Sequence, residues 1–202
     1  SRSSAATMHS PPLPAGQPPQ LREAAPADAE AIQGIYSHHV LHGLASFETE
    51  PPSVAEVRLR ITRLLDAGFP YLVVRDPSDR HILGYAYAGP FRVRPADRFT
   101  VEDSIYVHPQ ATGRGLGRAL LERLIVECER RGYRQMLAVI GDSANAASIG
   151  VHLACGFSEP MILTGTGDMY AKGAVVLHTL RGLVGDRSFF QLLRRWLYPT
   201  PD

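Results

Sequence analysis

The fold of this chain is decided by residues 99–117, FTVEDSIYVHPQATGRGLG, where a strand pattern turns into a glycine loop. Residues 99–107 alternate between two faces, as the side chains of a half-buried strand do. The apolar face carries Phe99, Val101, Ile105 and Val107. The other face carries Glu102, Ser104 and Tyr106. Asp103 interrupts the apolar face, which indicates either a bulge or an exposed position.

The loop itself is rich in glycine and is followed by a helix. It reads Thr112, Gly113, Arg114, Gly115, Leu116, Gly117. Glycines leave successive backbone N–H groups bare, and the positive end of the following helix favours an anion such as a pyrophosphate. Arg114 and Arg118 add positive charge. On its own the loop is equally consistent with a tight turn whose glycines serve only positive φ.

Two other phosphate-binding patterns fit this loop poorly. A dinucleotide-binding fold requires G-x-G-x-x-G, but Arg118 stands where the third glycine belongs. A P-loop ends in Gly-Lys-Ser/Thr, and this loop has no such lysine.

Hydrophobic periodicity extends the pattern to both sides of the loop. The helix after it has an apolar stripe of Leu120, Leu121, Leu124, Ile125 and Cys128, and Gly132 ends it. The expected elements alternate between strand and helix in an order typical of a mixed α/β domain. We predict strands at 21–24, 71–74, 82–88, 99–107 and 136–140, and helices at 28–42, 53–67, 117–131 and 143–156. We expect Asp28 to cap the first of these helices, Ser53 the second, and Gly141-Asp142-Ser143 the last.

Composition limits the class of protein. The chain has 202 residues and a formal net charge of +1, which argues against nucleic acid as a partner. No apolar stretch approaches the roughly 20 residues that span a bilayer, so no membrane partner is expected. Cys128 and Cys155 show no pairing pattern, which indicates a reducing cytoplasm. We expect a disordered Pro-rich leader at 1–20, one domain at 21–160 and an atypical helical segment at 161–202.

Two further groups of polar residues are candidates for chemistry. Asn145, Ser148 and His152 share one helix face, which suits an amide-rich chain such as pantetheine, although a solvated face has the same pattern. Glu102 is suited to take a proton from an amine that attacks a thioester, although a single Glu is more often a surface or salt-bridged residue.

Metal and thiol chemistry have weaker support. His38 and His42 stand four apart on a helix, but no carboxylate or Cys completes a ligand set, so we expect no metal. Cys155 precedes Gly156 at a helix end and fits a packed residue better than an acyl nucleophile.

Together these residues resemble the Gcn5-related N-acetyltransferase (GNAT) superfamily, and more closely the phosphinothricin and methionine sulfoximine acetyltransferases. The resemblance covers about residues 21–157. It is carried by HVLHG at 39–43, ASFETEPP at 45–52, GYAYAGPFR at 84–92, TVEDSIYV at 100–107, the glycine loop, and AVIGDSANAAS at 138–148.

The resemblance implies an α/β fold whose mixed central sheet splays at an acetyl-CoA site, with helices on both faces. It implies that the backbone of Ile105, Tyr106 and Val107 binds the thioester and pantetheine, that residues 112–117 take the pyrophosphate, and that Asn145 holds the pantetheine arm. Glu102 matches the family's proposed base, and His152 matches a histidine near the reacting groups. The acceptor, a small-molecule amine, would contact Phe47, Arg92, Arg94 and Arg98. The guanidinium groups of the three arginines suit the carboxylate of an amino acid. A homodimer is also possible on this reading.

Two departures from the family pattern bear on activity. Thr112 stands where the family loop begins with Gln or Arg. After Phe157 the expected sheet-completing strands are not evident, and the tail resembles a fragment of zinc aminopeptidases around Tyr170, without their H-E-x-x-H motif. The main prediction is therefore an N-acetyltransferase that detoxifies an amino acid or analogue. The alternatives are a catalytically impaired acetyl-CoA-binding module and a protein N-acetyltransferase.

Overall fold

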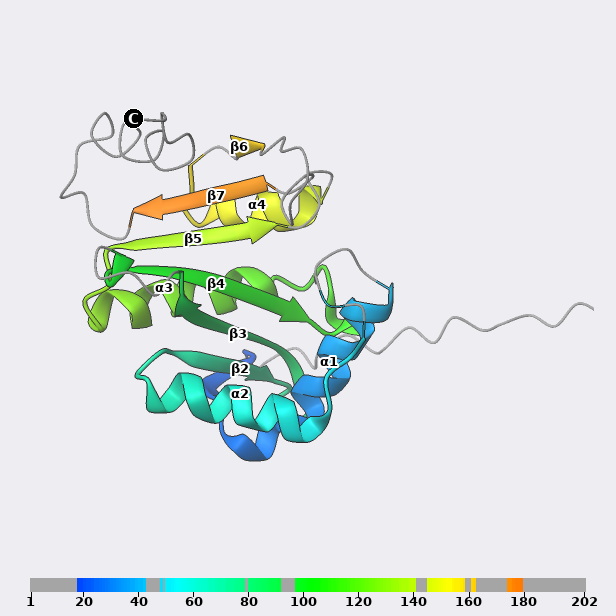
Figure 1. The fold of residues 1–202 in the computed structure, drawn as a ribbon. Coiled ribbons are helices and arrows are strands. Elements are labelled where there is room, and N and C mark those ends of the chain that lie inside the picture. The colour runs from blue at the N-terminus through cyan, green and yellow to red at the C-terminus, as the bar shows by residue number, and fades with distance from the viewer. Residues whose placement is uncertain are drawn as a thin grey trace, which may run out of the picture.

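The computed structural model describes residues 18–42, 48, 50–78, 80–91, 97–140 and 145–158, and the backbone of 161–162 and 174–179. These residues form a seven-stranded sheet with helices on both faces (Figure 1). Its strand order is β1 (Gln20–Glu23), β2 (Tyr71–Arg75), β3 (Ile82–Pro90), β4 (Thr100–Val107), β5 (Gln135–Ile140), β7 (Ala174–Thr179) and β6 (Met161–Ile162). Neighbouring strands are antiparallel, except that β4 and β5 are parallel.

Within the described residues, four α-helices cover the sheet, two on each face (Figure 1). They are α1 (Ala29–His42), α2 (Val54–Asp66), α3 (Leu116–Arg130) and α4 (Ala146–Ala154), with short 3-10 turns at Pro26–Asp28 and Pro109–Ala111. Helices α1 and α2 pack on a face rich in tyrosine, with Tyr71, Tyr85 and Ile61 in its core. Helix α3 lies on the opposite face, where the predicted leucine stripe is buried. The two faces of β4 therefore pack against two separate hydrophobic cores.

The sheet opens between its two parallel strands. The last paired residues are Asp103 on β4 and Ala138 on β5, although β4 continues to Val107 and β5 to Ile140. Beyond this point each strand still pairs with its outer neighbour, β3 or β7. The predicted splay is therefore confirmed.

The prediction of a helical C-terminal segment is wrong for residues 174–179. This stretch, AVVLHT, forms β7 and pairs with β5 along six residues, so the sheet is completed beyond β5. Two valines and a threonine in six residues favour a strand beside the apolar β5. The expected likeness of the tail to zinc aminopeptidases is not borne out. The predicted helix over 185–197 and residues 1–17 of the predicted leader lie outside the described residues.

Two predicted helix caps also differ. Helix α4 is capped by Asn145, whose Oδ1 accepts a hydrogen bond from Ser148 N at 3.0 Å. Asp28, expected to cap α1, instead accepts from Ala25 N at 2.8 Å and pairs with Arg22 at 2.7 Å. The Ser53 cap of α2 is confirmed, with Glu56 N donating to Ser53 Oγ at 3.2 Å. No described helix has the length and apolar character needed to cross a membrane.

Candidate active site

The opening between β4 and β5 is the centre of the candidate site. It holds a cavity of about 60 Å³ between the two diverging strands and the first turns of α4. From β4 it is lined by Ile105 and Tyr106, and from α4 by Asn145, Ser148 and His152. Five residues that the sequence analysis selected from two separate motifs thus lie around one opening. Unpaired strand backbone can hydrogen-bond an extended chain inserted there.

His152 is buried at this site, with only 4% of its surface exposed. Its Nδ1 lies 2.7 Å from the Ser148 carbonyl oxygen, which can only accept, so Nδ1 carries a proton. Its Nε2 lies 3.0 Å from Asp103 Oδ2. Burial lowers the pKa of His152, but the hydrogen bond and charge of Asp103 outweigh this and raise it overall. While both contacts hold, the ring has no lone pair with which to accept a substrate proton.

Asp103 lines the site but was not among the site residues that the sequence analysis selected. Neither the bulge nor the exposure is found, because β4 pairs regularly with β3 along its length and Asp103 is 6% exposed. Its side chain lies on the α3 and α4 side of the sheet, where His152 supplies its partner. The sequence does contain a pattern that could have predicted this pair. It is a charged residue at an apolar position of the strand together with a histidine on an otherwise apolar helix.

Glu102 points to the other face of β4, as the alternation predicts. It lies opposite Gly89 of β3 and is partly buried. Burial, and secondarily the negative charge of Asp103, raise the pKa of Glu102 above its usual range. A carboxylate of raised pKa is a stronger base than an exposed one, and it stands one residue before the last paired residue of β4.

The glycine loop has the backbone conformation that its sequence indicates. Gly113 and Gly115 have φ values of +74° and +75°, and Gly115 is the N-cap of α3. Leu116 is buried in the core, while Gly117 packs near Val107. The loop therefore begins a fifteen-residue helix, after β4 and the 3-10 turn Pro109–Ala111.

The side chains of the loop contact protein groups in this structure. Arg118 Nε lies 2.7 Å from Glu122 Oε1, and Arg114 Nη2 lies 3.9 Å from Asp76 Oδ2. The Thr112 hydroxyl donates to the Pro109 carbonyl at 3.1 Å. The binding roles predicted for these side chains remain predictions.

Helix α1 contributes a histidine that the sequence analysis did not select. His39 Nε2 donates to the Val107 carbonyl oxygen at 2.9 Å, which ties α1 to the end of β4. Burial, only partly offset by this hydrogen bond, lowers the pKa of His39. His38 and His42 lie with ring centroids 5.0 Å apart. The described residues contain no group of three or more His, Cys, Asp or Glu side chains placed to hold a metal ion.

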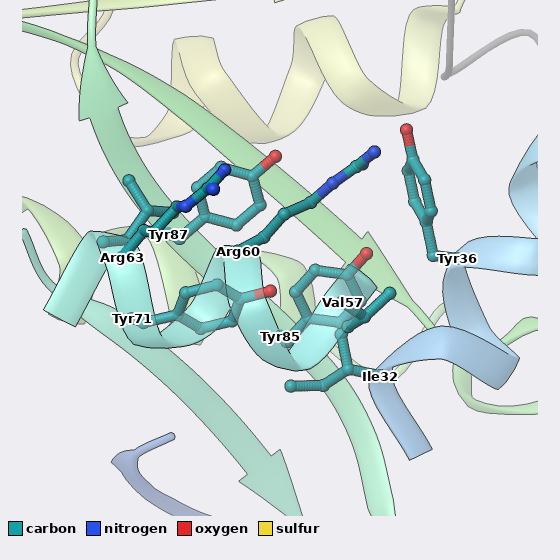
Figure 2. Close-up of a pocket in the computed structure, with 9 residues that line it drawn as sticks. Ile32, Tyr36, Val57, Arg60, Arg63, Tyr71, Tyr85 and Tyr87 are labelled. Carbon is teal, nitrogen blue, oxygen red and sulfur yellow. The ribbon is translucent and has the colours of Figure 1, made fainter. Parts of the chain in front are cut away.

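A second cavity, of about 300 Å³, lies on the Glu102 face of the sheet, beneath α2. Figure 2 shows tyrosine side chains from the sheet gathered there, with Tyr36 reaching in from α1. Tyr71, Tyr85 and Tyr87 stack with centroids 4.9–6.4 Å apart. Arg60 lines the cavity and is held by Glu48 at 2.7 Å and Glu56 at 3.0 Å. This cavity, which we call the tyrosine cavity, is large enough for an amino-acid-sized molecule.

The predicted acceptor residues are only partly described. Phe47, Arg92 and Arg94 lie outside the described residues. Arg98 is exposed, and its guanidinium lies 4.4 Å above the Phe99 ring. The tyrosine cavity was not predicted, because its sheet tyrosines come from two strands whose register the sequence analysis did not fix.

Comparison with known proteins agrees with this architecture. The family described as acetyltransferase (GNAT) family matches residues 35–157, so the chain belongs to the GNAT acetyltransferases. It is 50% identical over 145 residues to a phosphinothricin N-acetyltransferase of Alcaligenes faecalis, which covers 72% of this chain and 73% of that protein. It is 41% identical to an L-methionine sulfoximine/L-methionine sulfone acetyltransferase of Salmonella typhimurium, over 68% of this chain and 79% of that protein.

A solved structure gives the same result. The GNAT phosphinothricin acetyltransferase of Sinorhizobium meliloti, in complex with acetyl-CoA, has a TM-score of 0.73 and 43% identity to this chain. The match covers 81% of this chain and 89% of that one. The fold and the enzyme class are therefore shared.

Proposed function

We propose that this chain transfers an acetyl group from acetyl-CoA to the amine of an amino acid or amino-acid analogue, with phosphinothricin and methionine sulfoximine as the first candidates. Relatives at 50% and 41% identity carry those activities in their names. The observation that carries the proposal is the position of Glu102, beside the β4–β5 opening and on the same face as the tyrosine cavity.

The residues present fit acetyl-CoA. Its pantetheine arm is amide-rich, and the opening offers strand backbone together with the polar side chains of Asn145 and Ser148. Its pyrophosphate suits the backbone N–H groups of the glycine loop at the start of α3. Bound there, acetyl-CoA supplies the acyl thioester that the amine attacks.

Glu102 acts as the base in this proposal. An ammonium group has no lone pair, so it must lose a proton before or during attack on the thioester. The Glu102 carboxylate takes that proton, directly or through a water. Because the pKa of Glu102 is raised, we expect activity to fall as the pH drops through that pKa.

The second candidate, a binding module without activity, is not favoured. It rested on the loss of the strands that complete the sheet, whereas β7 pairs with β5 over Gln135–Ile140. The wall beyond β5 is thus present.

The test is acetyl-CoA turnover, measured by thiol release, with phosphinothricin, methionine sulfoximine and several amino acids. Glu102→Gln should lower kcat about 10²–10⁴-fold, the range of general-base catalysis, and remove the acidic limb of the pH profile. Glu23→Gln, an exposed carboxylate on the edge strand β1, is the control and should behave as the wild type. If the turnover of Glu102→Gln equals that of the wild type, Glu102 is not the general base. If the wild type shows no turnover with any acceptor, the proposed activity is excluded.

A further inference from the structure

Helix α4 is short and packs on the core through the partly buried Ile149 and Val151 and through one buried side chain. It is nine residues long, and His152 is its one buried residue within the described part of the chain. Helices this short are marginal by themselves, so tertiary contacts decide where they lie. The polar residues that α4 brings to the cavity, Asn145 and Ser148, occupy its first turn.

The ring of His152 links that first turn to β4. One ring nitrogen holds the Ser148 carbonyl at 2.7 Å, and the other holds Asp103 Oδ2 at 3.0 Å. Asp103 is the last β4 residue that pairs with β5. The chain of contacts therefore runs from the point where the sheet opens to the helix turn that lines the opening.

Asp103 has a second feature that places it at this site. Its side chain is 2% exposed, and its Oδ1 is buried with no hydrogen-bond partner among the described residues. Asp103 also lines the cavity between the strands. A buried carboxylate oxygen without a donor is costly, which indicates that it serves the site rather than stability alone.

We propose that Asp103 is a positioning residue for the acyl-CoA site: through His152 it holds Asn145 and Ser148 at the opening where the pantetheine arm lies. This inference rests on the proposed use of acetyl-CoA. Loss of the Asp103 charge releases the first turn of α4, so it weakens acetyl-CoA binding more than it slows the chemical step.

The link depends on pH in one direction. The pKa of His152 is raised, so the charged pair is complete at pH below about 6.5 and is lost as pH rises through the raised pKa. The charge of Asp103 also acts on two thiols, Cys155 beside α4 and Cys128 on α3, and Cys155 in turn feels the charges of Arg118 and Glu122 on α3. Burial raises the pKa of both thiols, so they stay neutral over the range in which His152 titrates. Strand β5 carries no ionisable side chain.

The experiment measures acetyl-CoA binding by titration calorimetry, the pKa of His152 by NMR of its ring, and kcat. Asp103→Asn keeps the shape of the side chain and removes its charge. We expect at least a fivefold weaker Kd, a kcat within twofold at saturating acetyl-CoA, and a lower pKa for His152. His152→Gln should weaken binding similarly, and the double variant should lose no more than either single one. Wild-type affinity should itself weaken as pH rises through the pKa of His152.

The control is Asp28→Asn, which breaks the Arg22 ion pair at the far edge of the sheet and should leave Kd unchanged. Circular dichroism and thermal unfolding establish that each variant is folded. If wild-type protein binds no acetyl-CoA, the proposed function fails. If wild-type protein binds it and Asp103→Asn binds equally well, or binds weakly with the pKa of His152 unchanged, the proposed function stands and this inference is overturned.

Discussion

Replacing Gly84 with alanine should strain the join between β3 and β4. A Cβ at this position would lie 3.0 Å from the Tyr106 carbonyl oxygen and 3.3 Å from Leu120 Cδ1. The Leu120 side chain can shift by a few tenths of an ångström, but the Tyr106 carbonyl belongs to a strand held by its ladder. Overpacking of this kind lowers the free energy of unfolding by about 1–3 kcal/mol, and the lower entropy of the unfolded chain offsets roughly 0.4–1 kcal/mol of this loss. We expect a net loss of about 1–2 kcal/mol in the free energy of unfolding.

The measurement is urea unfolding followed by circular dichroism, with a matched control on the same strand. A Cβ at Gly89 would meet only Leu64 Cδ2, at an ordinary 3.7 Å, so Gly89→Ala should be neutral or slightly stabilising. For a chain of this size Gly84→Ala should also lower Tm by roughly 2–8 °C. Because Tyr106 lines the opening, acetyl-CoA affinity should fall as well. A Gly84→Ala protein as stable as Gly89→Ala would refute the close approach of the two strands.

Two further predictions concern a helix cap and an ion pair. Asn145→Ala and Ser53→Ala each remove an N-cap, so each should lower the free energy of unfolding in urea by about 1 kcal/mol. Only Asn145→Ala should weaken acetyl-CoA binding. If the two variants bind acetyl-CoA equally well, Asn145 lies outside the site. Burial raises the pKa of Asp28, but its hydrogen bonds with Arg22 and Ala25 outweigh this and lower it overall. The pair is partly exposed, so Asp28→Asn should cost about 0.5–1 kcal/mol at pH 7 and nothing once the pH has fallen through the lowered pKa. A difference in stability that persists after the Asp28 carboxylate is protonated would contradict this.

The parts of the fold that sequence predicts are those fixed by short-range patterns. The alternation over residues 99–107 gives the two faces of β4, and the leucine stripe gives the buried face of α3. The glycines at 113 and 115 take the positive φ values that the loop pattern indicates. In each case residues that are close together in the sequence decide the conformation, so no knowledge of distant contacts is needed.

The parts that sequence does not predict depend on partners far along the chain. Asp103 and His152 are 49 residues apart, and His39 and the Val107 carbonyl are 68 apart. Within its own strand Asp103 breaks the pattern, and only the position of α4 shows why a charge is tolerated there. The strand at 174–179 was missed for a related reason. Its strand character is plain in AVVLHT, but its place in the sheet depends on β5, which lies 34 or more residues earlier.

Two neighbouring acidic residues on β4 point to opposite faces of the sheet. Glu102 faces the tyrosine cavity side and Asp103 faces α4, because consecutive strand residues point in opposite directions. Their charges still interact, since Asp103 contributes to the raised pKa of Glu102 while it raises that of His152. Removing the Asp103 charge should therefore lower both pKa values together. In the proposed mechanism one carboxylate thus acts on the base on one face and on the positioning of α4 on the other, so Asp103→Asn should shift the acidic limb of activity toward lower pH and flatten the alkaline loss of acetyl-CoA affinity.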